Sequence, residues 1–183
     1  MDGSRAGKDF FKMFSYPLIA GNADNALADM HGIAISRKMA EIFFGSPSNA
    51  MGKTLRYENK LDFIVTAVFE NVPEQSSLYF DFLLNMDAQK HLLEWASPNL
   101  LAYADLTDNA DPKKVESEIN AYLRPRFDKE GNIKTTIGLQ LLGEQYLHNI
   151  FVNGKPTAGR IEYVRIFSLI ALFILLIACV NFM

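Results

Sequence analysis

The last 18 residues of the chain, 166–183, constrain its fold more than any other segment because they carry no charged side chain. Twelve of them are Leu, Ile, Val or Phe, and only Ser168 and Asn181 are polar. A helix of this length extends about 27 Å, close to the roughly 30 Å hydrocarbon thickness of a bilayer. Its transfer into a membrane is favourable by about 4–7 kcal/mol before the cost of the two polar groups. We therefore predict a transmembrane helix over 166–183. A buried core helix, which normally keeps a polar stripe, is the alternative.

All charged residues lie at or before Arg165 and nearly balance, with 18 basic and 21 acidic side chains and a net charge of −3. This balance gives no basic surface that would indicate nucleic-acid binding. Lys155, Arg160 and Arg165 precede the apolar run and favour a cytoplasmic location for that end. The positive-inside rule loses force for loops longer than about 60 residues, so charge leaves the orientation open. Cys179 is the only cysteine, which rules out an intrachain disulfide.

The segment "FFGSPSNAMGKTL" ends in Gly52-Lys53-Thr54, the last three residues of the phosphate-binding loop of nucleotide hydrolases. That loop needs a glycine five positions before Gly52, where this chain has Pro47, which has no N–H to donate. A phosphate-binding loop also follows a strand and opens a helix, whereas here a helical pattern comes first and strands follow. We therefore interpret the segment as a polar turn and do not assign Lys53 as a nucleotide ligand.

The first half of the chain has clear helix and strand patterns. We expect a helical turn at the start of "DFFKMFSYPLIAGN", a strand over 31–36, and a helix over 37–44 with Ser36 as N-cap and Gly45 as C-terminal stop. Residues 53–69 read as a hairpin that turns at Glu58-Asn59-Lys60. Its second strand alternates Phe63, Val65, Ala67 and Phe69 against Ile64, Thr66 and Val68. Because both sets are mostly apolar, we expect this strand to be central in its sheet.

Shorter sequence patterns in the second half of the chain predict further helices and strands. Strands are expected over 76–86, 100–106 and 135–147, and a helix over 87–96. A second helix begins with Asp111 as its cap and Pro112 at its first position, and it places Val115, Ile119 and Leu123 on one face. Residues 148–160, rich in Gly, Pro and Asn, are interpreted as a linker to the apolar run.

No group of side chains predicts an active site or a metal site. His31, His91 and His148 are isolated, without the short repeated spacings of metal ligands. Asp29, His31 and Ser36 contain the residue types of a catalytic triad, but residues this close in one segment rarely supply all three, and no nucleophile-elbow motif is present. The 14 phenylalanines are interpreted as core residues, with an apolar substrate groove as the alternative. We predict no catalytic, cofactor-binding or metal-binding residue.

Four stretches, taken together, carry a resemblance to a known family: "FFKMFSYPLIAGNADNAL", "IAISRKMAEIFFGSPSNAMGKTL", "FIVTAVFENVPEQSSLYFDFLL" and "RIFSLIALFILLIACVNFM". In this order and spacing they resemble the MacB-like periplasmic core domain of FtsX-type ABC transporter permeases, followed by a transmembrane helix. The resemblance extends from about Phe10 to Met183, and its sequence style is similar to versions common in Bacteroidetes-type bacteria. Such permeases have an earlier helix and opening strands before the Phe-Phe motif, so we expect this chain to be a fragment or to have a misplaced start.

The resemblance implies an α+β extracytoplasmic domain of two lobes over residues 1–150. A porter-like lobe would combine residues 9–78 with a closing strand near 137–150, an inserted lobe would span about 79–136, and a linker over 151–165 would lead to the helix. It also implies an inner-membrane location with the domain facing the periplasm. The partners would be a cytoplasmic ATPase subunit, a second permease protomer, membrane lipid and a periplasmic partner protein.

The resemblance further implies a non-enzymatic function, in which the domain couples ATP-driven movement of membrane helices to the handling of a substrate or partner outside the membrane. A lipoprotein-releasing or cell-division permease of the same superfamily, in which the domain binds a periplasmic partner, is the first alternative. A membrane-anchored enzyme is the second. The sequence does not identify the transported substrate or the oligomeric state.

Overall fold

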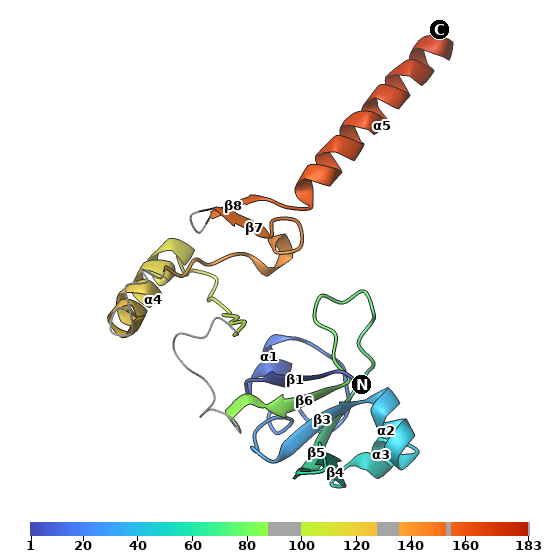
Figure 1. The fold of residues 1–183 in the computed structure, drawn as a ribbon, viewed down its shortest axis with the longest axis vertical. Helices are drawn as coiled ribbons and strands as arrows, with labels where there is room; N and C mark the ends of the chain where they lie inside the picture. The colour runs from blue at the N-terminus through green and yellow to red at the C-terminus, as the bar shows by residue number, and fades with distance from the viewer. Residues whose placement is uncertain (88–99, 128–135, 153–154, 183) are drawn as a thin grey trace. The chain divides into compact units, whose positions relative to one another are not determined.

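The computed structural model describes residues 1–87, 100–127, 136–152 and 155–182, which fall into two compact units (Figure 1). The first unit, Met1–Ser97, has mixed α and β structure. Its described strands are β1 (Gly3–Ala6), β2 (Leu18–Ala20), β3 (Gly32–Ser36), β4 (Thr54–Tyr57), β5 (Leu61–Phe69) and β6 (Phe82–Asn85). Its described helices are α1 (Phe10–Met13), α2 (Arg37–Phe44) and α3 (Pro47–Ala50).

The six strands form one mixed sheet in the order β1-β6-β3-β5-β2, with β4 also paired to β5. Strands β1 and β6 run parallel, as do β3 and β5, whereas the other pairs are antiparallel. Strand β5 therefore pairs with three others, which confirms its predicted central place. The turn predicted at Glu58-Asn59-Lys60 is confirmed too, since Glu58 and Asn59 both adopt the positive φ angles (50° and 55°) of a tight hairpin turn.

Both faces of the sheet are buried under a hydrophobic cluster. On one face, Ile33 and Ile35 of β3 pack with Met39 of α2 and Ala50 of α3. On the other face, Ala34 packs in a cluster with Phe11 of α1 and the loop residues Leu27, Val72 and Phe80. Because each face is covered, apolar residues occur at successive positions along β3 and β5.

A β-bulge in β5 changes the predicted alternation of that strand. Ile33 pairs with Val65, but the next residue, Ala34, pairs with Ala67, so Thr66 is an extra residue. Phe63 and Val65 consequently join the cluster under α2, while Ala67 and Phe69 join the opposite cluster. The prediction that Phe63, Val65, Ala67 and Phe69 share one face is therefore wrong. The Thr66 hydroxyl lies within hydrogen-bond distance of two carbonyl oxygens outside β5, that of Ala26 at 2.6 Å and that of Ile33 at 3.2 Å, and its proton can be donated to either.

Strand β1 was not predicted, because residues 3–6 show no apolar alternation and only Ala6 is buried. Its place is determined by pairing with β6, in which Gly3 is the partner of Phe82. A Cβ atom at Gly3 would overlap the Phe82 ring, so the absence of a side chain allows the ring to lie against this strand. Asp2 extends the pairing, since its carbonyl accepts from the Asp81 N–H at 2.7 Å and its N–H donates to the Asp81 carboxylate at 2.9 Å.

The second unit, Pro98–Met183, contains the longer helices and a small two-stranded sheet. Its described elements are α4 (Pro112–Phe127), the 3₁₀ turn η2 (Leu142–Glu144), β7 (Ile150–Val152), β8 (Lys155–Ala158) and α5 (Ile161–Phe182). The predicted cap of α4 is confirmed, because the Asp111 side chain accepts from the Lys113 N–H at 2.9 Å. Helix α5 confirms the predicted apolar helix and begins five residues before its uncharged part.

Three sequence predictions for residues 87–160 are wrong or fall outside the described residues. Residues 100–106 form no strand, because no described strand pairs with them, and Leu101 is 71% exposed. Residues 148–160 are not a featureless linker but contain the β7–β8 hairpin. The helix predicted over 87–96 lies outside the described residues apart from Asp87.

The strand predicted over 135–147 is also absent from its described part, 136–147, and the reason is visible in its hydrogen bonds. The Ile137 N–H donates to the Asn120 side chain at 2.8 Å, and the Asn120 amide donates to the Ile137 carbonyl at 2.7 Å. The Leu139 N–H reaches Glu116 at 3.4 Å. Side chains of α4 therefore form the hydrogen bonds with the backbone of this segment that a neighbouring strand would otherwise form, and the segment is not part of a sheet.

The expected closing strand near 137–150 does not join the sheet of the first unit, whose described strands all lie within residues 3–85. Strand β6, which lies in the region expected to form the inserted lobe, pairs with β3 and β1 of that sheet. The structure thus gives a mixed α+β domain with a six-stranded sheet, a second small sheet and a long apolar helix. The lobe boundaries stay a prediction.

Candidate functional site

The Gly52-Lys53-Thr54 segment uses its backbone N–H groups inside the fold. The Gly52 N–H donates to the Val65 carbonyl at 2.9 Å, and the Lys53 N–H donates to the Ala50 carbonyl at 3.1 Å. The Lys53 carbonyl accepts from the Val65 N–H at 2.9 Å, and Thr54 begins β4. A phosphate-binding loop must present these N–H groups to the phosphates. The geometry therefore supports the interpretation of this segment as a turn.

The residue types of the triad do not meet. His31 lies directly before β3 and Ser36 at its other end, and the buried Ser36 hydroxyl accepts from the Met39 N–H at 3.2 Å as the cap of α2. The Asp29 carboxylate accepts from the His31 backbone N–H at 2.8 Å and lies 3.7 Å from the imidazole Nδ1. His91 lies outside the described residues. Among the described residues, no three His, Cys, Asp or Glu side chains gather as a metal site would require.

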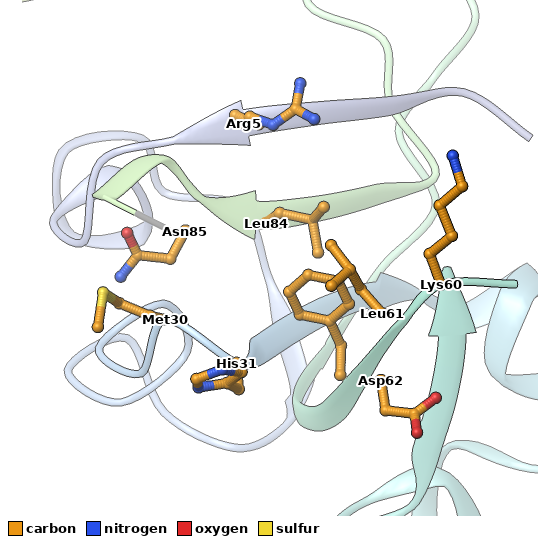
Figure 2. Close-up of a pocket in the computed structure, with 9 residues that line it drawn as sticks. Arg5, Met30, His31, Lys60, Leu61, Asp62, Leu84 and Asn85 are labelled. Atoms are coloured by element: carbon orange, nitrogen blue, oxygen red, sulfur yellow. The ribbon is translucent and has the colours of Figure 1, made fainter. Parts of the chain in front are cut away.

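A pocket of about 300 Å³ lies on the first unit, between the β4–β5 hairpin, the end of β6 and strand β1 (Figure 2). Leu61, Phe63 and Leu84 give it an apolar floor, and Figure 2 shows Leu61 and Leu84 side by side at its centre. Arg5 and Lys60 stand at its rim and supply positive charge. The pocket can accept a small apolar group.

The one carboxylate at the rim of this pocket is engaged by a neighbouring guanidinium. Arg56 donates to Asp62 from Nε at 2.8 Å and from Nη2 at 2.9 Å. These hydrogen bonds, assisted by the charge of Arg56, lower the pKa of Asp62 below its ordinary value. Asp62 therefore stays ionised and paired near neutral pH, a state that suits structure better than general acid catalysis.

A second candidate feature is the junction between the folded part of the second unit and α5. The Ile161 N–H, at the first residue of the helix, donates to the Leu147 carbonyl at 3.1 Å. The Arg160 guanidinium lies 4.3 Å from the centre of the Tyr146 ring, within the range of a cation–π contact. Gly159 is buried, and a Cβ there would lie 2.5 Å from the Leu147 carbonyl oxygen and 2.6 Å from the Asn149 side-chain oxygen. The junction is therefore closely packed, and it fixes the start of α5 to residues 146–149.

Helix α5 itself is long and apolar enough to cross a membrane, and its most apolar 18-residue window is not buried by any described part of the chain. This exposure is expected of a helix that faces lipid and differs from that of a core helix.

Residues 2–122 match the model of a protein family described as the MacB-like periplasmic core domain. The chain belongs to this family. The matched range includes the whole six-stranded sheet and part of α4, whereas the β7–β8 hairpin and α5 of this MacB-like domain lie beyond it.

The MacB-like domain is also similar to a solved structure described as a domain of a permease protein from Porphyromonas gingivalis. The two share 26% sequence identity with a TM-score of 0.51, and the similarity covers 70% of this chain and 60% of the other. This chain thus spans less than two thirds of that structure. No curated protein matches the chain.

Proposed function

We propose that this chain is the extracytoplasmic part of an ABC transporter permease, and that it couples ATP-driven motion of membrane helices to the handling of a substrate or partner in the periplasm. Membership in the MacB-like periplasmic core domain family supports this proposal. The similarity to a permease domain and the apolar α5 agree with it. We assign the chain no catalytic role, and ATP is hydrolysed by a separate cytoplasmic subunit.

The single observation that carries the mechanical part of the proposal is the packed junction at the start of α5. Because Ile161 is hydrogen-bonded to Leu147 and Arg160 lies over Tyr146, a shift of the helix is transmitted to residues 146–149. A flexible linker would absorb such a shift. Hinge or shear motion of the two expected lobes, the porter-like lobe and the inserted lobe, would then open and close the domain.

The proposed partners are the cytoplasmic ATPase, a second permease protomer, membrane lipid and a periplasmic protein, with the chain located in the inner membrane. The ATPase supplies the free energy, and lipid surrounds α5. A second protomer and a periplasmic protein would provide the surfaces against which the two units move.

The test uses the full-length permease assembled with its ATPase. Spin labels at Glu41→Cys in α2 and Glu118→Cys in α4, with Cys179→Ser, report the distance between the two units. We expect the distance distribution to change between the nucleotide-free and ATP-bound assemblies. An unchanged distribution while ATP is hydrolysed normally would mean that the domain is a passive docking surface.

A matched pair of insertions separates transmission from assembly. Inserting three flexible residues between Gly159 and Arg160 loosens the connection between β8 and α5, so that Ile161 is no longer held beside the Leu147 carbonyl. The same insertion between Glu74 and Gln75 lengthens an exposed loop of the first unit. We expect the first insertion to abolish the distance change while ATP hydrolysis continues, and the second to preserve it. Retention of the distance change with the first insertion would contradict transmission through this junction.

A further inference from the structure

The β7–β8 hairpin exposes apolar side chains on both of its faces. Ile150, Phe151 and Val152 are consecutive residues of β7, so they alternate between the two faces, yet their exposed fractions are 51%, 50% and 54%. An isolated two-stranded hairpin is marginally stable in water. A hairpin with this apolar surface therefore needs something to cover it.

The chain segments at both ends of the hairpin hold it at the start of α5. Only Gly159 and Arg160 separate the last residue of β8 from Ile161, so that end lies within roughly 10 Å of the helix. Leu147, three residues before β7, accepts the hydrogen bond from Ile161 at 3.1 Å. Chain connectivity and this bond thus keep the hairpin beside the first turn of α5.

The first turn of α5 lies at the level of lipid headgroups if the helix crosses a bilayer. The uncharged part begins after Arg165, and Ile161 is four residues earlier, about 6 Å along the helix axis. Each interfacial layer of a bilayer is about 5–7 Å thick. Tyr146 and Tyr163 are 62% and 65% exposed at this junction, and tyrosine is enriched at this depth in membrane proteins.

We propose that the β7–β8 hairpin is a membrane-surface contact, in which the apolar side chains of β7 enter the interfacial layer of the bilayer around α5. This goes beyond the proposed transport function, since it requires only that α5 crosses the membrane. The segment carries acidic Glu144 and Glu162 and basic Lys155, Arg160 and Arg165, so its charges nearly balance and burial of apolar surface supplies the main attraction to the bilayer.

The experiment places single nitroxide labels on the full chain in vesicles of phosphatidylethanolamine and phosphatidylglycerol. Phe151→Cys and Val152→Cys, in a Cys179→Ser background, report the two hairpin faces. The native Cys179 alone reports α5, and Glu118→Cys, also in the Cys179→Ser background, reports exposed α4. Collision with oxygen, which concentrates in lipid, is compared with collision with a water-soluble nickel chelate. Far-UV circular dichroism of each labelled chain verifies that it is folded.

We expect collisions with oxygen to exceed collisions with the nickel chelate at Cys179 and at one or both hairpin positions. At Glu118→Cys we expect the reverse. Dominance of the chelate at both hairpin positions, with Cys179 in lipid, would overturn the lipid contact and leave the membrane helix intact. Low access of both reagents at both positions would overturn it in favour of a protein cover, and dipolar broadening between labels would identify that cover as a second copy. Chelate dominance at Cys179 would instead reject the membrane span on which both proposals depend.

Discussion

Arg37, the first residue of α2, binds Glu70, the residue that follows β5, through two hydrogen bonds. They run from Nε to Oε2 at 2.9 Å and from Nη2 to Oε1 at 2.5 Å. The neighbouring Lys38 N–H donates to the Asn71 side chain at 2.9 Å, so the start of α2 is fixed to the end of β5 at two points. This attachment holds α2 over the sheet face that contains Ile33 and Val65.

The Arg37–Glu70 pair makes stability depend on pH in the acid range. Hydrogen bonds from Arg37, with its charge and the Asn71 N–H, lower the pKa of Glu70 below its ordinary value of 4.5. A folded pKa below the unfolded one means that the pair stabilises fully above pH 4.5 and loses this effect as pH falls through the folded pKa. Glu70→Gln should therefore be less stable than the parent chain at pH 7, and the two should converge in acid.

Urea unfolding of the first unit at a series of pH values measures this difference. Because both side chains are more than a third exposed, the effect should shrink at high salt. Arg37→Gln should reproduce the loss at pH 7, and combining the two substitutions should add little to either alone. Equal spacing between Glu70→Gln and the parent chain at every pH would contradict the role of the pair.

Gly21 and Gly45 provide a matched comparison of two glycines with positive φ, at 85° and 80°. A Cβ at Gly45 meets nothing within 4 Å, whereas one at Gly21 would lie 2.6 Å from the Thr66 backbone carbonyl oxygen. Gly45→Ala should lower the free energy of unfolding by about 1–2 kcal/mol from backbone strain alone. Gly21→Ala should cost a further 1–3 kcal/mol or so, because the Thr66 carbonyl cannot move away without disturbing β5. Chemical denaturation measures both, and equal costs would show that the contact with Thr66 relaxes freely.

Asn120 should control the order of the segment beside α4. Its side chain exchanges two hydrogen bonds with Ile137 and also donates to the Glu116 carbonyl at 2.8 Å. Asn120→Leu removes both bonds to Ile137, while Asn120→Asp retains the acceptor and loses the donor. Amide hydrogen exchange at Ile137 should be fastest in Asn120→Leu and intermediate in Asn120→Asp. Parent-like exchange in Asn120→Leu would mean that other contacts hold the segment.

The Gly52-Lys53-Thr54 turn should not bind nucleotide, because the N–H groups of Gly52 and Lys53 are donated to protein carbonyls. Calorimetric titration with Mg-ATP should give no binding heat for the parent chain or for Lys53→Ala. A micromolar dissociation constant that disappears in Lys53→Ala would overturn this assignment.

The elements that could be predicted are those whose local sequence and tertiary contacts agree. Ser36 and Gly45 mark the two ends of α2, and the Glu58-Asn59 turn sets the β4–β5 hairpin, so all three follow from short-range rules. Strand β1 could not be found in this way, because its polar residues have no pattern and its pairing partner, β6, lies about 80 residues away. Long-range pairing of this kind leaves little local signal.

The second unit shows a missed signal and a misleading one. Asn153-Gly154 between Val152 and Lys155 is a strong hairpin-turn dipeptide, and it could have identified the β7–β8 hairpin in place of a linker. The apolar residues of 136–147, by contrast, favoured a strand whose role is taken by the Asn120 and Glu116 side chains. Nor does the pocket beside Leu61 have a sequence signature, because strand pairing brings its lining together from distant positions.

The extra residue at Thr66 also determines how the chain responds to changes in length. Loss of one residue from a surface loop shortens a connection and leaves the sheet in place. Loss of Thr66 itself would likewise keep the present pairing, with Val65 opposite Ile33 and Ala67 opposite Ala34, because the remaining residues already alternate between the two clusters as in a regular strand. The centre of β5 is thus a position where deletion of a single codon would leave the contents of both cores in place and would remove only the Thr66 hydroxyl from the carbonyl oxygens of Ala26 and Ile33.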